Sequence, residues 1–161
     1  MRTTARKTTT GFTILEGAVG LVVLSIGVAC ALGGLTRFNG LAGAARNASG
    51  AYTALMNQID LIQSDGPFNP QKTNLDGTPQ IPPELTLGTQ TQTNVPIYQD
   101  PNTGVIVAGT MTTTVTDISS TYTSGATTFS LPIYKAVVTV SYRYLGRPYS
   151  FSMTTIRASD I

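Results

Sequence analysis

The 161-residue sequence predicts an α+β fold in which one long N-terminal helix, half apolar and half amphipathic, packs on an antiparallel β-sheet. Twenty uncharged residues, 17–36, are followed by apolar residues spaced three or four positions apart as far as Ile62, which is the period of an α-helix. Beyond residue 94, apolar and polar residues alternate as they do in β-strands. Threonine, which favours strands, occurs 27 times.

Composition excludes several classes of function. Charged residues make up 11% of the chain, against about 25% in typical soluble domains. Residues 1–11 carry three basic side chains and no acidic one, so the net charge of +2 comes from this segment alone. Because no basic face is predicted elsewhere, we expect no nucleic-acid partner. There is no histidine and only one cysteine. We therefore expect no catalytic site, no cofactor, no resident metal and no intrachain disulfide.

The uncharged segment 17–36 has the length of a membrane-spanning helix, because twenty helical residues extend about 30 Å. Basic residues ahead of it predict a cytoplasmic N-terminus. The segment is longer than the apolar core of a secretory signal peptide. Glu16 stands at its head, and a lone carboxylate costs about 2–3 kcal/mol at the bilayer centre, less near the interface. No basic residue follows Gly11 closely, but cleavage after Gly11 would create a cation, the α-amino group of Phe12.

These residues resemble the class III signal of type IV pilins and type II secretion pseudopilins: KTTTG at 7–11, FTILE at 12–16, then the apolar helix. The resemblance covers about the first 36 residues, and residues 21–27 resemble minor pilins and minor pseudopilins more than major ones. It implies that a prepilin peptidase cleaves after Gly11 and that Phe12 becomes the N-methylated first residue. It also implies that Glu16 pairs with the N-terminus of a neighbouring subunit during filament assembly.

The resemblance implies a structural subunit, a minor pilin or pseudopilin, of a type IV pilus or a type II secretion filament. Its partners would be other pilin or pseudopilin subunits, the prepilin peptidase and the bacterial inner membrane. The precursor would cross that membrane once, with its N-terminus in the cytoplasm and its folded domain in the periplasm.

Two features depart from the family pattern. No proline occurs before Pro67, where many pilins have one inside the membrane helix, and Gly33-Gly34 occupies the comparable region. The chain also lacks the disulfide that closes the C-terminal loop of many major pilins.

Two alternatives do not involve filaments. One is a lipid-anchored periplasmic binding module, because residues 28–30 loosely resemble a lipoprotein cleavage site ending at Cys30. Gly27 and Glu16 fit that signal poorly. The other is a signal-anchored β-domain that never assembles.

We divide the chain into a leader, 1–11, a transmembrane and assembly helix, 12–36, and a periplasmic domain, 37–161. The domain comprises a helix to about residue 64, a loop over 65–93 and an antiparallel sheet over 94–157. An apolar stripe is predicted to face the sheet, with Asn47 and Gln58 among the residues that face solvent. The stripe consists of Phe38, Leu41, Ala45, Ala48, Tyr52, Leu55, Ile59 and Ile62. The sequence SDGP at 64–67 predicts the end of the helix.

Several turns divide the predicted sheet. Residues 100–104 form a Pro- and Gly-containing turn, in which Asp100 and Asn102 have Ca²⁺-ligand chemistry but are typical turn formers. A threonine-rich strand follows to Asp117, and residues 119–130 are predicted to be a loop. Residues 134–144 alternate as a strand. A two-residue turn at 146–147 would pair Tyr144 with Tyr149.

Overall fold

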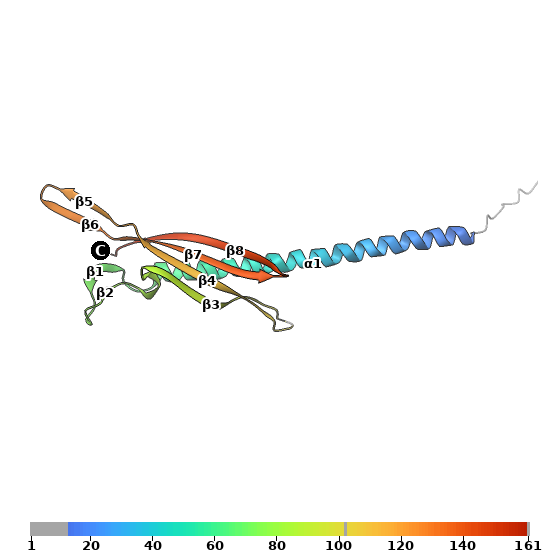
Figure 1. Cartoon of the computed structure of the whole chain (residues 1–161), viewed down its shortest axis with the longest axis horizontal. Helices are drawn as coiled ribbons and strands as arrows, with labels where there is room; N and C mark the ends of the chain where they lie inside the picture. Colours follow the sequence, from blue (N-terminus) through green and yellow to red (C-terminus); the bar gives the residue numbers. More distant parts are fainter. Residues whose placement is uncertain (1–12, 102, 161) are drawn as a thin grey trace, which may run out of the picture. The chain divides into compact units, whose positions relative to one another are not determined.

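The computed structural model describes residues 13–101 and 103–160. The chain separates into two compact units, Met1–Gly43 and Ala44–Ile161. Helix α1 (Ile14–Ser64) contributes to both (Figure 1). The second unit contains, in order, β1 (Asn69–Thr73), β2 (Pro79–Gln80), the 3₁₀ turn η1 (Pro83–Leu85), β3 (Gly88–Gln99), β4 (Ile106–Asp117), β5 (Ser120–Ser124), β6 (Thr127–Leu131), β7 (Ile133–Tyr144) and β8 (Arg147–Ala158).

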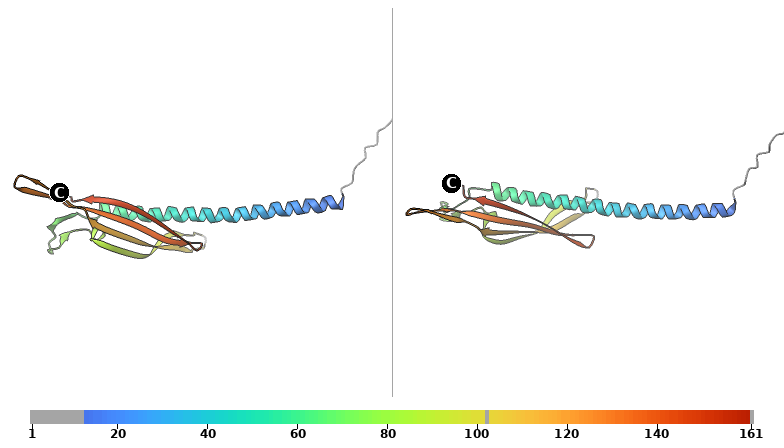
Figure 2. Two further views of the ribbon diagram at one scale, coloured as in Figure 1. Left: turned by 45° about the horizontal axis from the view of Figure 1, so that its top comes forward. Right: turned by 90° about the horizontal axis from the view of Figure 1, so that it is seen from above.

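The main sheet of the second unit has the strand order β3-β4-β7-β8, and all its pairs are antiparallel. The part of α1 from residue 44 to Ser64 lies along one face of this sheet (Figure 2). The predicted α+β class is therefore confirmed. The segment 65–93, predicted as a loop, contains β1, β2, η1 and the start of β3, so the sheet begins earlier than residue 94.

The core lies between α1 and the sheet. The alternation predicted for 134–144 is confirmed, because every second residue of β7 from Tyr134 to Tyr142 is buried. On the helix, the predicted stripe is wrong at several positions. Phe38 and Leu41 are exposed, Tyr52 is 49% exposed, and Asn47 and Gln58 are buried instead of solvent-facing. The buried residues of α1 are Asn47, Ala51, Leu55, Gln58 and Ile62.

Close packing at Gly50 gives the physical reason why Asn47 and Gln58 are buried and Tyr52 is not. A Cβ atom built on Gly50 would lie 1.9 Å from the carbonyl oxygen of Ile97 in β3. The helix therefore turns its smallest residues, Gly50 and Ala51, toward the sheet. The large ring of Tyr52 lies at the flank and packs on Phe151, with ring centroids 4.8 Å apart. The close approach of the α1 and β3 backbones thus decides which helix face is buried, and the hydrophobic spacing of the stripe does not.

The hairpins differ from prediction in two places. Residues 119–130 are not an irregular loop, because β5 pairs with β6 as a separate exposed hairpin. The β7–β8 turn lies at Leu145-Gly146, so Tyr144 pairs with Arg147 and Tyr142 pairs with Tyr149. The predicted register was wrong by two residues, which preserves the face of each side chain. Leu145 and Gly146 both have positive φ, 49° and 75°, as a type I′ turn requires.

Candidate functional site

The first half of α1 exposes its apolar side chains on all sides. Residues 17–36 carry no charged side chain, and the most apolar stretch of the helix is not buried among the described residues. The exposed large side chains are Ile14, Leu15, Val19, Leu21, Val22, Val23, Leu24, Ile26, Val28, Leu32 and Leu35. A helix that is apolar all round belongs in a protein core or a membrane. This helix is thus compatible with a single-pass membrane anchor.

The hydroxyl groups of this apolar segment are satisfied within the helix. Ser25 Oγ donates a hydrogen bond to the Leu21 carbonyl oxygen at 2.7 Å, and Thr36 Oγ1 donates to the Gly33 carbonyl oxygen at 2.9 Å. In hydrocarbon, where no water can replace a missing partner, an unsatisfied polar group costs several kcal/mol. The local hydrogen bonding therefore suits an apolar surrounding.

Four glycines in the same segment pack against none of the residues that the structure describes. A Cβ atom on Gly20, Gly27, Gly33 or Gly34 would meet no described atom within 4 Å. Each glycine nevertheless costs a helix about 1 kcal/mol relative to alanine. Small residues in membrane helices allow the backbones of neighbouring helices to approach closely. Gly50, in the second half of α1, differs from them, because β3 occupies the position that its Cβ atom would take.

The described part of the N-terminal site begins at Thr13. Gly11 and Phe12, the predicted cleavage and methylation residues, lie outside the described residues, as do the basic residues of the leader. Thr13 precedes α1 and caps it: its Oγ1 and its carbonyl oxygen accept hydrogen bonds from the Glu16 amide at 3.3 and 3.0 Å. Thr13-x-x-Glu16 has the residue spacing of a capping box.

Glu16 is exposed in the first turn of α1. A carboxylate is favourable at this end of a helix because the unpaired amide groups there carry partial positive charge. Within residues 13–101 and 103–160, Glu16 forms no ion pair. The local helix geometry thus accounts for a carboxylate at this position but supplies no full counter-charge.

Comparison of the chain with protein-family models, curated proteins and solved structures found no match.

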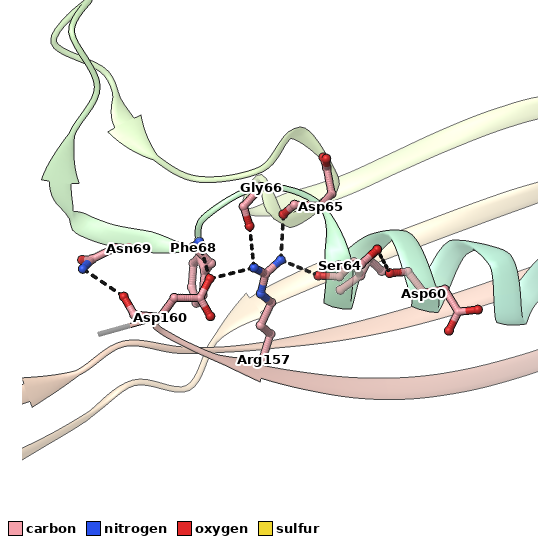
Figure 3. Close-up of polar contacts among 9 residues, drawn as sticks. Asp60, Ser64, Asp65, Gly66, Phe68, Asn69, Arg157 and Asp160 are labelled. Atoms are coloured by element: carbon pink, nitrogen blue, oxygen red, sulfur yellow. Dashed lines mark hydrogen bonds and ion pairs between the residues drawn. The ribbon is translucent and has the colours of Figure 1, made fainter.

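A second site, at the C-terminal end of α1, was not predicted from the sequence. Arg157 of β8 is 7% exposed, and its guanidinium donates hydrogen bonds to the carbonyl oxygens of Ile62, Asp65 and Gly66 at 2.9, 2.9 and 2.7 Å (Figure 3). These carbonyls include groups that a helix end leaves without intrahelical donors. A fourth hydrogen bond, to Asp160 Oδ2 at 2.9 Å, forms an ion pair. We call this arrangement of Arg157 and Asp160 around the helix end the C-terminal clasp.

Phe68 connects the clasp to the chain that follows α1. Its amide donates to Asp160 Oδ2 at 2.8 Å, and its carbonyl oxygen accepts from the Asp160 amide at 2.7 Å. The guanidinium carbon of Arg157 lies 5.8 Å from the centre of the Phe68 ring. The hydrogen bond from the Phe68 amide, followed by that from Arg157, lowers the pKa of Asp160. The clasp therefore ties the last residues of the chain to the helix end without a disulfide.

One signal in the sequence marks Arg157. Inward-facing positions of β8 alternate, and Tyr149, Phe151 and Met153 occupy them with partial burial. Continuing that alternation places Arg157 on the inward face, where an unpaired charge is costly. A basic residue in such a position predicts a buried partner, although the alternation does not identify which one.

Two acidic residues lie close together beside the same helix end. The pKa of Glu84 is raised, first by burial and then by a hydrogen bond with Asp65. One carboxylate oxygen of Glu84 is buried without a hydrogen-bond partner. Glu84 therefore holds a proton more readily than an isolated carboxyl group.

The 100–104 turn is present as predicted. The Asp100 carbonyl oxygen accepts from the Gly104 amide at 2.8 Å, Asp100 Oδ1 accepts from the Thr103 amide at 3.4 Å, and Gly104 has a φ of 70°. Asn102, the other candidate Ca²⁺ ligand, lies outside the described residues. In the part of the chain that the structure describes, no three His, Cys, Asp or Glu side chains form a potential metal site.

Proposed function

We propose that this chain is a minor pilin or pseudopilin, a structural subunit of a type IV pilus or a type II secretion filament. The observation that carries the proposal is the wholly exposed apolar half of α1, with Glu16 in its first turn, ahead of a folded α+β domain. The leader pattern at 7–16 agrees with it.

The proposed mechanism has two stages. In the membrane, lipid covers the apolar half of α1, and the prepilin peptidase removes residues 1–11. In the filament, the same side chains pack against the α1 helices of other subunits. Burying one large aliphatic side chain contributes about 1.5–3 kcal/mol, but lipid already supplies that burial. Assembly therefore needs a contact that lipid does not offer.

Glu16 and Phe12 supply that contact. In the proposed filament, the Glu16 carboxylate of one subunit pairs with the methylated Phe12 amine of another. Unit charges attract more strongly in a medium of low dielectric constant than in water. A carboxylate left unpaired in the apolar bundle would oppose assembly, so the pair also fixes the axial position of the incoming subunit.

The glycines favour assembly over simple anchoring. A membrane anchor that contacts only lipid gains nothing from glycines that weaken its helix. Helices that pack on other helices do gain from them, because small residues permit close backbone contact. Because no neighbour from residues 13–101 or 103–160 lies within 4 Å of these Cβ positions, they are open to contact with other chains.

Filament incorporation of Glu16 variants tests the proposal. Glu16→Gln retains the size of the side chain but cannot form the ion pair, and Glu16→Ala removes both. We expect both variants to be processed normally and to be depleted at least tenfold from sheared filament fractions. Asp60→Asn is the matched control, because Asp60 is an exposed acidic residue of the same helix in the folded domain. Equal incorporation of Glu16→Gln and wild type would refute charge pairing as the docking mechanism.

A further inference from the structure

The face of the main sheet turned away from α1 contains a hollow of about 850 Å³, which we call the outer-face hollow. Residues of β3, β4, β7 and β8 line the hollow, and no residue of α1 does. Thr110, Ser141 and Ser150 alternate along their strands with the inward-facing residues, so they belong to the outer face. The lining also includes Gly109, Tyr142 and Tyr149, which occupy the inward-facing positions between them.

A bulge in β3 forms one wall. The pairing of β3 with β4 shifts between Gln92 and Val95, and Asn94 within this interval has a φ of 60°. Bulges redirect side chains and are frequent beside functional sites. Asn94 lies in the lining of the outer-face hollow. The bulge therefore places the side-chain amide of Asn94 in the wall of the hollow, at a point where β3 departs from regular strand pairing.

A row of hydroxyl groups crosses the floor. Thr110 pairs with Ser141 in the β4–β7 ladder, and Ser141 pairs with Ser150 in the β7–β8 ladder. Adjacent strands lie about 4.8 Å apart, so three hydroxyls stand side by side at that interval. The Ser141 hydroxyl already donates to the Thr110 carbonyl oxygen at 3.5 Å, so it offers a ligand only acceptor lone pairs. The hydroxyls of Thr110 and Ser150 and the amide of Asn94 offer both donors and acceptors to a ligand that carries several hydroxyl groups.

Arg143 adds one positive charge. It is exposed in the lining of the hollow, and the described residues give it no ion pair and no hydrogen bond. None of the lining residues is acidic. A guanidinium binds a carboxylate or a sulfate through two parallel hydrogen bonds. The ligand is thus expected to carry an anionic group next to its hydroxyls.

These features separate the possible ligand classes. Nucleic acid requires several basic residues, and the hollow has one. An extended peptide would add to a sheet edge, whereas the hollow lies on a sheet face. We propose that the outer-face hollow binds an acidic saccharide, through Arg143 to its carboxylate or sulfate and through the hydroxyl row to its hydroxyls. This binding does not depend on the proposed filament function.

Calorimetric titration of the full-length chain in detergent micelles tests the proposal. The probes are a galacturonic acid trimer, a sulfated galactose oligomer and, as a neutral comparison, the methyl ester of the trimer. We expect at least one acidic probe to bind at least tenfold more tightly than the ester. The stronger acidic probe distinguishes a carboxylate ligand from a sulfate ligand. Absence of binding by both acidic probes, or equal binding of the ester, would overturn the proposal.

Three variants locate the binding. Arg143→Gln should weaken the acidic probe at least tenfold, whereas Arg147→Gln, the matched exposed arginine on the same hairpin outside the lining, should change its affinity less than twofold. Asn94→Gly should fold normally, because glycine adopts positive φ readily, but should bind about fivefold more weakly after losing one hydrogen bond. Equal losses in the two arginine variants would show nonspecific charge attraction and overturn the assignment.

Discussion

Replacement of Arg157 by methionine is predicted to destabilise the folded domain by about 3 kcal/mol. Methionine retains much of the side-chain volume but donates no hydrogen bond. The carbonyl oxygen of Ile62 would lose its buried donor, which costs about 1–3 kcal/mol. The bonds to Asp65 and Gly66 are partly buried, so water recovers part of their loss. Asp160 is 54% exposed, so its ion pair contributes only about 0–1 kcal/mol.

Thermal melting followed by near-ultraviolet circular dichroism of the tyrosines measures this effect in the full-length protein. For a domain of this size, 3 kcal/mol corresponds to a fall in Tm of about 10 °C. Arg157→Lys should lie between the wild type and the methionine variant, because lysine keeps the charge but lacks the planar fork. Arg147→Met, at the exposed start of β8, is the control and should leave Tm unchanged. A Tm for Arg157→Met within about 2 °C of the wild type would refute the stabilising role of the clasp.

Two further substitutions test the domain. Burial and Asp65 raise the pKa of Glu84 in the folded domain. The stabilisation from protonated Glu84 is therefore fully present below the pKa that this residue has in the unfolded chain, and it is lost as pH rises through the pKa in the folded domain. Glu84→Gln should therefore raise Tm at pH 7 and leave it unchanged near pH 3; equal melting curves of the variant and wild type at pH 7 would contradict this. Gly50→Ala should lower domain stability by about 1–3 kcal/mol through overpacking against β3, whereas Gly34→Ala, which meets open space, should not. A domain melt of Gly50→Ala equal to that of Gly34→Ala would disprove the close contact.

The sequence predicts the main architecture because periodicity directly reflects burial. The uncharged run and the helical spacing predicted α1, and strict alternation predicted the inward face of β7. The helix end was also predictable, since Gly66 adopts the positive φ expected of a glycine that follows a helix. These features depend on neighbours in the sequence, so one chain suffices to infer them.

Three features of the fold were not predicted from the sequence, and their causes differ. The contact of Gly50 with Ile97 rotates the helix and buries Asn47 in place of Tyr52. The β7–β8 register depends on the positive φ of Leu145, which leucine rarely adopts, so composition favoured a turn one residue later. The β5–β6 hairpin consists of serine and threonine with few aromatic residues, and this composition is as typical of loops as of strands.

Part of the candidate site was predictable from the sequence and part was not. Glu16 and the apolar helix follow from local sequence, and the structure adds the Thr13 cap and the satisfied hydroxyls. The C-terminal clasp joins Arg157 to carbonyls more than ninety positions earlier in the chain. No local pattern identifies those acceptors.

The intact mass of the protein recovered from membranes tests the proposed function most directly. Processing as a pilin predicts the loss of residues 1–11 and the gain of one methyl group on Phe12, in membranes and in sheared filament fractions alike. A chain retaining its leader, or one lacking residues 1–29 and carrying acyl chains on Cys30, would contradict it.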